Sequence, residues 1–147
     1  MKIKVKKMSP DAILPTSGTD MAAGYDLYAC GIKNEDGVQI YPGQVEVIGT
    51  GIAVEIPEGY AGLLMSRSGM ATKRGLRLST GCSLLDPDFR GEIFCPTYND
   101  SSKPRDIKNG DRIAQLVVVP FMSLDFELTD ELSDTNRGTG GFGSTGR

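Results

Sequence analysis

Residues 43–65 read GQVEVIGTGIAVEIPEGYAGLLM, which is three short apolar runs separated by glycine and proline. Short runs of alternating or clustered apolar residues, bounded by turn residues, are typical of β-strands. The runs predict strands over residues 43–48, 51–56 and 60–65, with a turn at Pro57-Glu58-Gly59 before the last strand. We therefore begin from β-structure as the organising pattern of the chain.

The same pattern extends in both directions along the chain. Further strands are predicted over residues 2–7, 24–30, 76–79, 92–99, 112–121 and 124–128. One short helix is predicted over residues 68–73, where Ser68 can cap the start and Gly75 can end it. Many short strands without strand–helix alternation indicate an all-β sandwich, barrel or jelly roll. Strand patterning stops near Asp134, so we predict one domain over residues 1–133 and a flexible, Gly-rich tail over residues 134–147.

Composition excludes several classes of function. The chain has 147 residues and a net charge of −3, which disfavours a broad surface for nucleic acid or anionic membranes. It has no histidine, so any catalysis must use carboxylates, Arg, Lys, backbone donors or a weakly held hard metal. The three cysteines are far apart and odd in number, which favours reduced thiols. With no membrane-length apolar stretch and no signal-peptide core, we expect a soluble, cytoplasmic protein.

The C-terminal residues 137–147 read RGTGGFGSTGR and combine phosphate-binding chemistry with one base-sized ring, Phe142. Glycine lets backbone N–H groups approach an anion closely. The hydroxyls of Ser144 and Thr145 add donors, and the terminal arginines add forked cationic ones. This composition suits a triphosphate. The alternative is a flexible polar tail with no binding role, which is common for Gly/Ser-rich termini.

Four further segments combine glycine, charge and aromatic residues. They are residues 22–29 (AAGYDLYA), 66–69 (SRSG), 81–91 (GCSLLDPDFRG) and 110–117 (GDRIAQLV). In the first, Asp26 lies in a predicted strand, where a lone Asp is ordinarily solvated. In the second, Arg67 and Ser68 with the Gly69 amide could hold a phosphate, or could be a surface arginine beside a capping serine.

The third and fourth segments also have two interpretations each. Residues 81–91 predict a hairpin in which Asp86 ends the incoming strand and Phe89 begins the return. A carboxylate and an aromatic ring would then lie together at one end of the hairpin and could form a single binding site. Asp is, however, also a common turn former. Residues 110–117 predict a turn into a buried strand, with Gln115 an unusual amide among apolar neighbours.

These five segments, in this order, resemble the five motifs of trimeric deoxyuridine triphosphate nucleotidohydrolases, the dUTPases. The resemblance runs from about residue 22 to the C-terminus. It implies a jelly-roll-like, distorted β-barrel subunit assembled as a homotrimer, in which each active site draws on all three chains. The tail would then close as a lid over a neighbouring subunit's active site.

The resemblance also implies an activity, namely Mg²⁺-dependent hydrolysis of dUTP to dUMP and pyrophosphate by attack of water on the α-phosphorus. This reaction keeps uracil out of DNA and supplies dUMP for thymidylate synthesis. Asp86 would orient and help deprotonate the water, and Asp26 would reach the metal through water. By the same resemblance, the phosphates would be bound by Arg67, Ser68, Gly69, Gln115, Arg137, Ser144 and Thr145. Uracil and deoxyribose would contact Thr80, Ser83, Leu84, Leu85, Phe89, Phe94, Phe142 and Gly143.

The chain departs from the common family pattern in two places within residues 81–91, and Met65-Ser66 precede Arg67 where proline is usual before the arginine. It reads Ser83-Leu84-Leu85-Asp86 where the family commonly has G-V-I-D, and Phe89 stands where tyrosine is usual. Two other interpretations remain open on the sequence: an enzyme related to deoxycytidine triphosphate deaminases, and a nucleotide-sensing module that regulates a protein partner. The partners expected are dUTP and two further copies of the chain, with no nucleic acid and no membrane.

Overall fold

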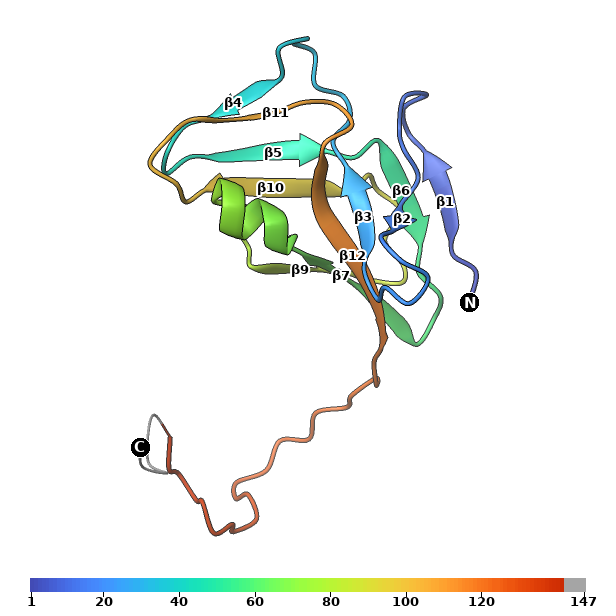
Figure 1. Cartoon of the computed structure of the whole chain (residues 1–147). Coiled ribbons are helices and arrows are strands. Elements are labelled where there is room, and N and C mark those ends of the chain that lie inside the picture. The colour runs from blue at the N-terminus through green and yellow to red at the C-terminus, as the bar shows by residue number, and fades with distance from the viewer. Residues whose placement is uncertain (142–147) are drawn as a thin grey trace.

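The computed structural model describes residues 1–141, and nearly all of its regular structure is strand. Figure 1 shows the elements around one body, from which the C-terminal segment extends. Their order is β1 (Lys4–Lys7), β2 (Thr16–Ser17), β3 (Tyr25–Tyr28), β4 (Val38–Ile40), β5 (Val45–Gly49), β6 (Ile52–Glu55), β7 (Tyr60–Met65), η1 (Met70–Arg74), β8 (Leu76–Leu78), β9 (Cys82–Leu85), β10 (Phe94–Asn99), β11 (Arg105–Ile107) and β12 (Arg112–Pro120).

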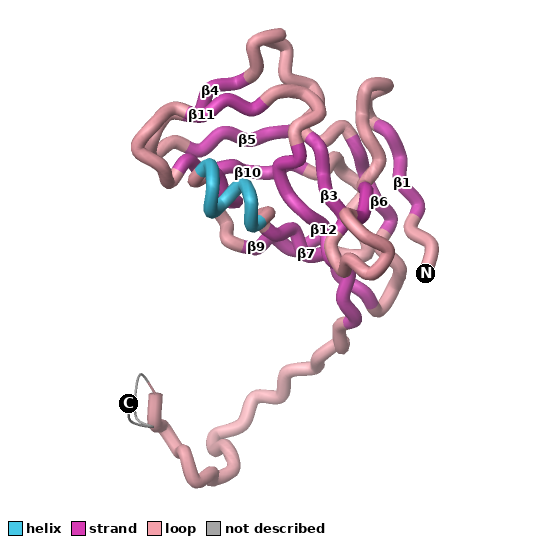
Figure 2. Tube along the Cα trace, in the orientation of Figure 1, coloured by secondary structure: helices cyan, strands magenta, loops and turns pink. Residues whose placement is uncertain are grey.

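The strands form four antiparallel sheets (Figures 1 and 2). The largest has the order β2-β3-β12-β7-β9, and a three-stranded sheet has the order β5-β10-β8. Two further pairs are β1-β6 and β11-β4. One apolar core joins the sheets, since it contains Leu27 and Leu64 from the largest, Leu78 and Cys95 from the three-stranded one, and Ile107 from β11. The all-β prediction is confirmed.

The strands predicted from apolar patterning are confirmed in eight segments, those of β1, β3, β5, β6, β7, β8, β10 and β12. The pattern missed β2, β4 and β11, which are two or three residues long. Runs that short carry no usable periodicity. They are strands because a partner lies beside them: β2 pairs with β3, and β4 pairs with β11.

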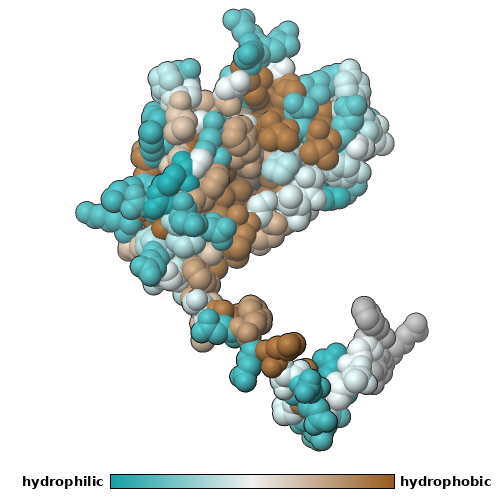
Figure 3. Space-filling view, turned by 180° about the vertical axis from the view of Figure 1, so that it is seen from behind, coloured by the Kyte–Doolittle hydropathy of each residue, from teal (hydrophilic) through white to brown (hydrophobic). Residues whose placement is uncertain are grey.

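The strand predicted over residues 124–128 is wrong, because no strand follows β12 in the described part of the chain. Phe126 is 92 % exposed and Leu128 is 98 % exposed, and this segment runs away from the body (Figures 1 and 2). Figure 3 shows apolar residues along it. Alternation of apolar and acidic residues is a strand pattern, but a strand needs a neighbouring strand for its backbone hydrogen bonds. Residues 1–141 of the same chain provide none for this segment.

The short helix begins one turn after β7, with Ser68 and Gly69 already helical and Met70–Arg74 in π-helical geometry. Gly75 ends it in the left-handed conformation, at φ 67°, as the sequence predicts. Ser68 does not act as the cap, since no side chain caps the start of this helix. The Ser68 carbonyl instead accepts a hydrogen bond from Thr72 Oγ1 at 2.7 Å. In residues 1–141, no helix is both long enough and apolar enough to cross a membrane.

Candidate active site

One row of residues crosses four neighbouring strands of the largest sheet. Gln115 in β12 pairs with Asp26 in β3 on one side and with Met65 in β7 on the other, and Met65 pairs with Cys82 in β9. The row brings together segments that lie far apart in the sequence. Neighbouring strands lie about 4.8 Å apart, so Asp26 and Cys82 are about 14 Å apart across three strand spacings. Arg67 follows the end of β7, next to this row.

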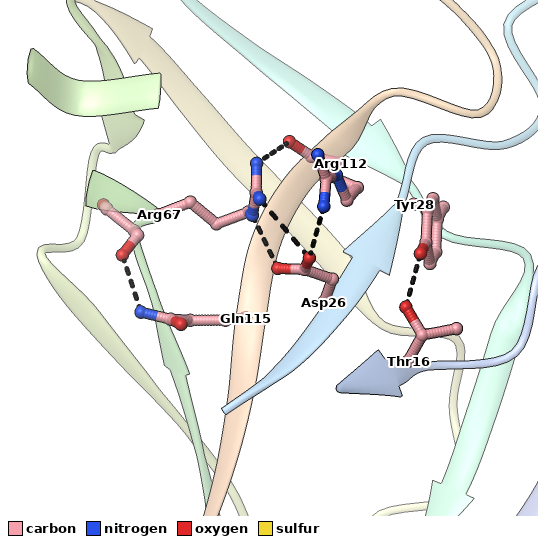
Figure 4. Close-up of polar contacts among 7 residues, drawn as sticks. Thr16, Asp26, Tyr28, Arg67, Arg112 and Gln115 are labelled. Carbon is pink, nitrogen blue, oxygen red and sulfur yellow. Dashed lines mark hydrogen bonds and ion pairs between the residues drawn. The ribbon is translucent and has the colours of Figure 1, made fainter. Parts of the chain in front are cut away.

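Asp26 lies at one end of the row between two arginines (Figure 4). It is 9 % exposed, and Arg67 holds it side-on: Nε donates to Oδ1 at 2.5 Å and Nη2 donates to Oδ2 at 3.3 Å. Arg112 Nη1 donates to the same Oδ2 at 3.2 Å. The backbone carbonyl of Arg112 also accepts a hydrogen bond from Arg67 Nη1 at 3.4 Å. Asp26 is therefore a buried ion-pair partner, and its interpretation as a solvated strand residue is wrong.

Arg112 has no role in the sequence interpretation, and a β-bulge explains why. Successive side chains of a regular strand alternate between faces, so Arg112 and Gln115, three residues apart, would point to opposite faces. The pairing of β12 with β3 shifts between Arg112 and Ala114, which inserts one extra residue. Arg112 and Gln115 can then both reach the site. The signal in the sequence was a charged residue at the start of an apolar strand.

Gln115 is fixed by two close neighbours. Its Nε2 donates to the carbonyl of Ser66 at 3.1 Å, at the end of β7 (Figure 4). A Cβ atom placed on Gly24 would lie 2.7 Å from Gln115 Oε1, so the side chain lies directly against the glycine backbone. Gly24 is part of the first motif. Glycine suits this position because a side chain here would collide with the Gln115 amide.

At the other end of the row, β9 is the edge strand of the largest sheet. Its residues pair with β7 on one side, so the backbone groups on its outer edge face away from any described strand. Thr80 and Ser83 at its start are joined by a hydrogen bond of 2.7 Å between their hydroxyls. Along the strand, Leu84 is exposed and Leu85 is buried, as alternation requires.

The hairpin predicted over residues 81–91 is half right: its incoming strand is confirmed as β9, but its return strand is wrong, because no strand begins at Phe89. The next strand, β10, begins at Phe94 and pairs with β5 and β8 in another sheet. Asp86 instead begins a tight turn, in which the Phe89 N–H donates to the Asp86 carbonyl at 3.1 Å. Arg90 Nη1 braces this turn by donating to the carbonyl of Pro87 at 2.6 Å. Here the chain leaves the five-stranded sheet and crosses to the three-stranded sheet.

The predicted carboxylate and ring do share this turn. Asp86 is exposed, and its carboxylate makes no hydrogen bond within residues 1–141. Phe89 is 41 % exposed, and its ring lies over Gly91, where an added Cβ would be 2.7 Å from Phe89 Cζ. Both groups are therefore accessible to a ligand at this turn.

The remaining predicted residues divide into four groups. Ser68 and Gly69 are exposed beside Arg67, in the first helical turn after β7. Phe94 is half exposed at the start of β10. Arg137 is exposed in the C-terminal segment, where its Nε donates to the Gly140 carbonyl at 2.8 Å. The predictions for Phe142, Gly143, Ser144 and Thr145 lie outside the described residues.

Comparison with known proteins decides the family of this chain. The family model described as dUTPase matches residues 10–146. The chain belongs to the dUTPase family. A dUTPase relative from Nautilia profundicola, a deoxyuridine 5′-triphosphate nucleotidohydrolase, is 44 % identical over 147 residues and covers the whole of both chains.

Solved dUTPase structures show the same fold. A mutant dUTPase of Staphylococcus bacteriophage 80alpha with dUpNHpp superposes with a TM-score of 0.86 and is 30 % identical, with 99 % of each chain covered. A mutant dUTPase from phage phi11 of S. aureus superposes with a TM-score of 0.75 and is 27 % identical, covering 89 % of this chain and 98 % of that one. The phi11 enzyme coordinates a structural Mg(II) ion.

Proposed function

We propose that this chain is a dUTP diphosphatase, which hydrolyses dUTP to dUMP and pyrophosphate. The observation that carries the proposal is the row across the largest sheet. It links a cluster with two arginines, around Asp26, to the outer edge of β9, whose backbone groups pair with no strand in residues 1–141. A nucleoside triphosphate needs both features, since one end is a polyanion and the other is a base with a hydrogen-bonding edge. In the homotrimer that we propose, the two features of one site come from neighbouring chains.

The phosphates bind at the cationic end of the row. Arg67 and Gln115 lie there together with the exposed Ser68 and Gly69, and arginine is suited to phosphate because of its forked N–H donors. We place the outer phosphates against residues supplied by the tail, which are Arg137, Ser144 and Thr145. Their hydroxyl and guanidinium donors match phosphate oxygens.

Uracil binds along β9. The outer backbone edge of this strand offers N–H and C=O groups in a fixed order, which can pair with the Watson–Crick edge of one base and leave another badly paired. The base and sugar contacts we propose are Thr80, Ser83, Leu84, Leu85, Phe89, Phe94, Phe142 and Gly143. The Thr80–Ser83 hydrogen bond holds the entrance to this strand in one conformation.

Asp86 acts as the general base. It lies directly after the uracil-binding strand, and its carboxylate is exposed, so it can accept a proton from a water beside the α-phosphate. As that proton leaves, the water oxygen forms a bond to the α-phosphorus. The bond between the α-phosphorus and the bridging oxygen breaks, and pyrophosphate departs with the electron pair. No imidazole is needed, which fits a chain without histidine.

Magnesium fits this site as an ion carried mainly by the triphosphate. Within residues 1–141, no group of three or more carboxylate or cysteine side chains could hold a metal ion. Asp26 accepts three hydrogen bonds from arginines, while a carboxylate has about four acceptor positions, so one position can accept a metal-bound water. When bound, Mg²⁺ neutralises developing charge on the phosphate oxygens.

We propose that the active enzyme is a homotrimer in which each site draws on all three chains: the Asp26, Arg67 and Gln115 cluster comes from one, β9 and Asp86 come from a second, and the 134–147 tail comes from the third. Exposed apolar surface supports subunit contact. Val47 in β5 is 60 % exposed and pairs with Pro96 in β10, where Phe94 is 50 % exposed on the same sheet. The apolar side chains of Phe126 and Leu128 also need a surface to cover them.

We further propose that the enzyme works in the cytoplasm. All three cysteines are free thiols, with Cys30 and Cys95 buried and Cys82 exposed. An exposed free thiol is most compatible with a reducing compartment.

The proposal is tested by measuring pyrophosphate release with Mg²⁺ on dUTP, dTTP, dCTP and UTP side by side. We expect turnover on dUTP alone. In Asp86→Asn, which keeps the shape but removes the base, we expect turnover to fall by about 10²-fold or more while dUTP still binds. No turnover on any of the four nucleotides would refute the proposal, and ammonia release from dCTP would show deaminase chemistry instead.

A further inference from the structure

We infer that Arg112 is a positioning residue for the phosphate-binding site, which fixes Asp26 against Arg67 and gives the three-residue cluster its net positive charge. The inference rests on the proposed function, because it concerns the same site. It assigns a role to a side chain that the motif interpretation leaves unexplained.

The first step is the bonding of Arg67. Its guanidinium donates from Nε and Nη2 to Asp26 and from Nη1 to the carbonyl of Arg112. A guanidinium has five N–H groups, so these contacts leave two for a phosphate oxygen. Arg67 is therefore oriented before any ligand arrives, and its orientation depends on where the Asp26 carboxylate lies.

The second step is how that carboxylate is held. Asp26 Oδ2 accepts a hydrogen bond from Arg112 as well as from Arg67 (Figure 4). The two arginines reach the carboxylate from different strands, because Arg67 follows β7 and Arg112 begins β12. Without the Arg112 side chain, the carboxylate would be held by Arg67 alone, so its position would be less firmly fixed.

The third step is charge. Asp26 and Arg67 alone form a pair with no net charge, which attracts a triphosphate weakly. Arg112 raises the total of the cluster to +1. Its side chain is 53 % exposed, against 23 % for Arg67, so the additional charge lies at the solvent side where a polyanion approaches.

The test compares two substitutions in the full-length enzyme. Arg112→Gln removes both the charge and the guanidinium fork, and Arg112→Lys keeps the charge alone. The probe is the dUTP analogue dUpNHpp, and the measurement is its Kd by calorimetry over a series of NaCl concentrations. We expect Kd to rise about 10-fold in Arg112→Gln, a typical loss for one charged hydrogen-bonding group, and to lose part of its salt dependence. In Arg112→Lys the salt dependence should return to that of the wild type, with a smaller rise in Kd.

The control is Arg105→Gln, which removes one positive charge from β11, where the arginine Nε contacts Ser101. It should leave Kd unchanged. A Kd within twofold of the wild type for Arg112→Gln overturns the inference. A second result would also overturn it: both Arg112 variants raise Kd equally, the salt dependence of Kd is unchanged, and the melting temperature falls. That combination is expected if Arg112 has a purely structural role. Failure of the wild type to bind dUpNHpp would instead overturn the proposed function.

Discussion

Replacing Asp26 by asparagine tests whether the cluster stabilises the fold as well as the site. The substitution keeps the shape of the side chain and removes its negative charge. Two arginines would then face each other without their shared counter-ion, and the asparagine NH₂ group would point at a cationic donor. We expect Asp26→Asn to be clearly less stable than the wild type.

The magnitude follows from burial. Removing one partner of a fully buried ion pair costs about 3–5 kcal/mol. The Asp26 side chain is 13 % exposed, but its partners Arg67 and Arg112 are 23 % and 53 % exposed, so water compensates part of the loss. Discounting for this screening gives a loss of about 2 kcal/mol in the free energy of unfolding. For a chain of this length that corresponds to a fall of about 6 °C in the melting temperature.

The assay is urea unfolding followed by far-UV circular dichroism, at one fixed protein concentration and in low-salt and high-salt buffers. The matched control is Asp36→Asn, the same chemical change at an exposed position whose carboxylate makes no hydrogen bond within residues 1–141. The control should stay within about 0.5 kcal/mol of the wild type. The reasoning is refuted if Asp26→Asn unfolds at the same urea concentration as the control.

Three other perturbations test separate parts of the structure. Deleting residues 137–147 should lower kcat/KM for dUTP by at least about 10²-fold without changing the circular dichroism spectrum, because phosphate-binding groups are lost; normal turnover would contradict the lid. Gly24→Ala should displace the Gln115 amide, raise KM for dUTP several-fold and lower the free energy of unfolding by about 1 kcal/mol. The control is Gly18→Ala, where an added Cβ meets nothing within 4 Å, and it should change neither KM nor stability. Burial raises the pKa of Cys95 to about 12, so its proton is retained in the folded state after the unfolded thiol ionises. The wild type should therefore lose stability relative to Cys95→Ser between about pH 9 and pH 12, by up to about 1.4 kcal/mol per pH unit, and parallel pH profiles would show that the thiol is not the cause.

Local patterning predicted much of this fold because most of the strands are short apolar runs bounded by turn residues. The runs in residues 43–65 became β5, β6 and β7, with the ends of β5 and β6 shifted by one or two residues and those of β7 as predicted. Gly75 ended the helix because a left-handed residue is needed there. In each case the deciding interaction lies within a few residues along the chain, where sequence can be interpreted directly.

Pairing between distant segments was harder to predict. The sequence interpretation joined residues 81–91 into a hairpin, but β9 pairs with β7 and the chain then crosses to another sheet. Likewise, Arg112 could not be assigned to the site, because strict alternation places it on the opposite face from Gln115. A single inserted residue in β12 reverses that assignment, and nothing in its local sequence marks the bulge.

In the proposed homotrimer, the extended segment after β12 would make the stability of this protein depend on its own concentration. In a single chain the side chains of Phe126 and Leu128 are exposed to water, and folding of that chain does not bury them. If a second copy covers them, each association event stabilises the folded state by mass action, so dilution lowers the melting temperature even though no bond within the chain changes. The amount of enzyme present then becomes one of the variables that keep it folded.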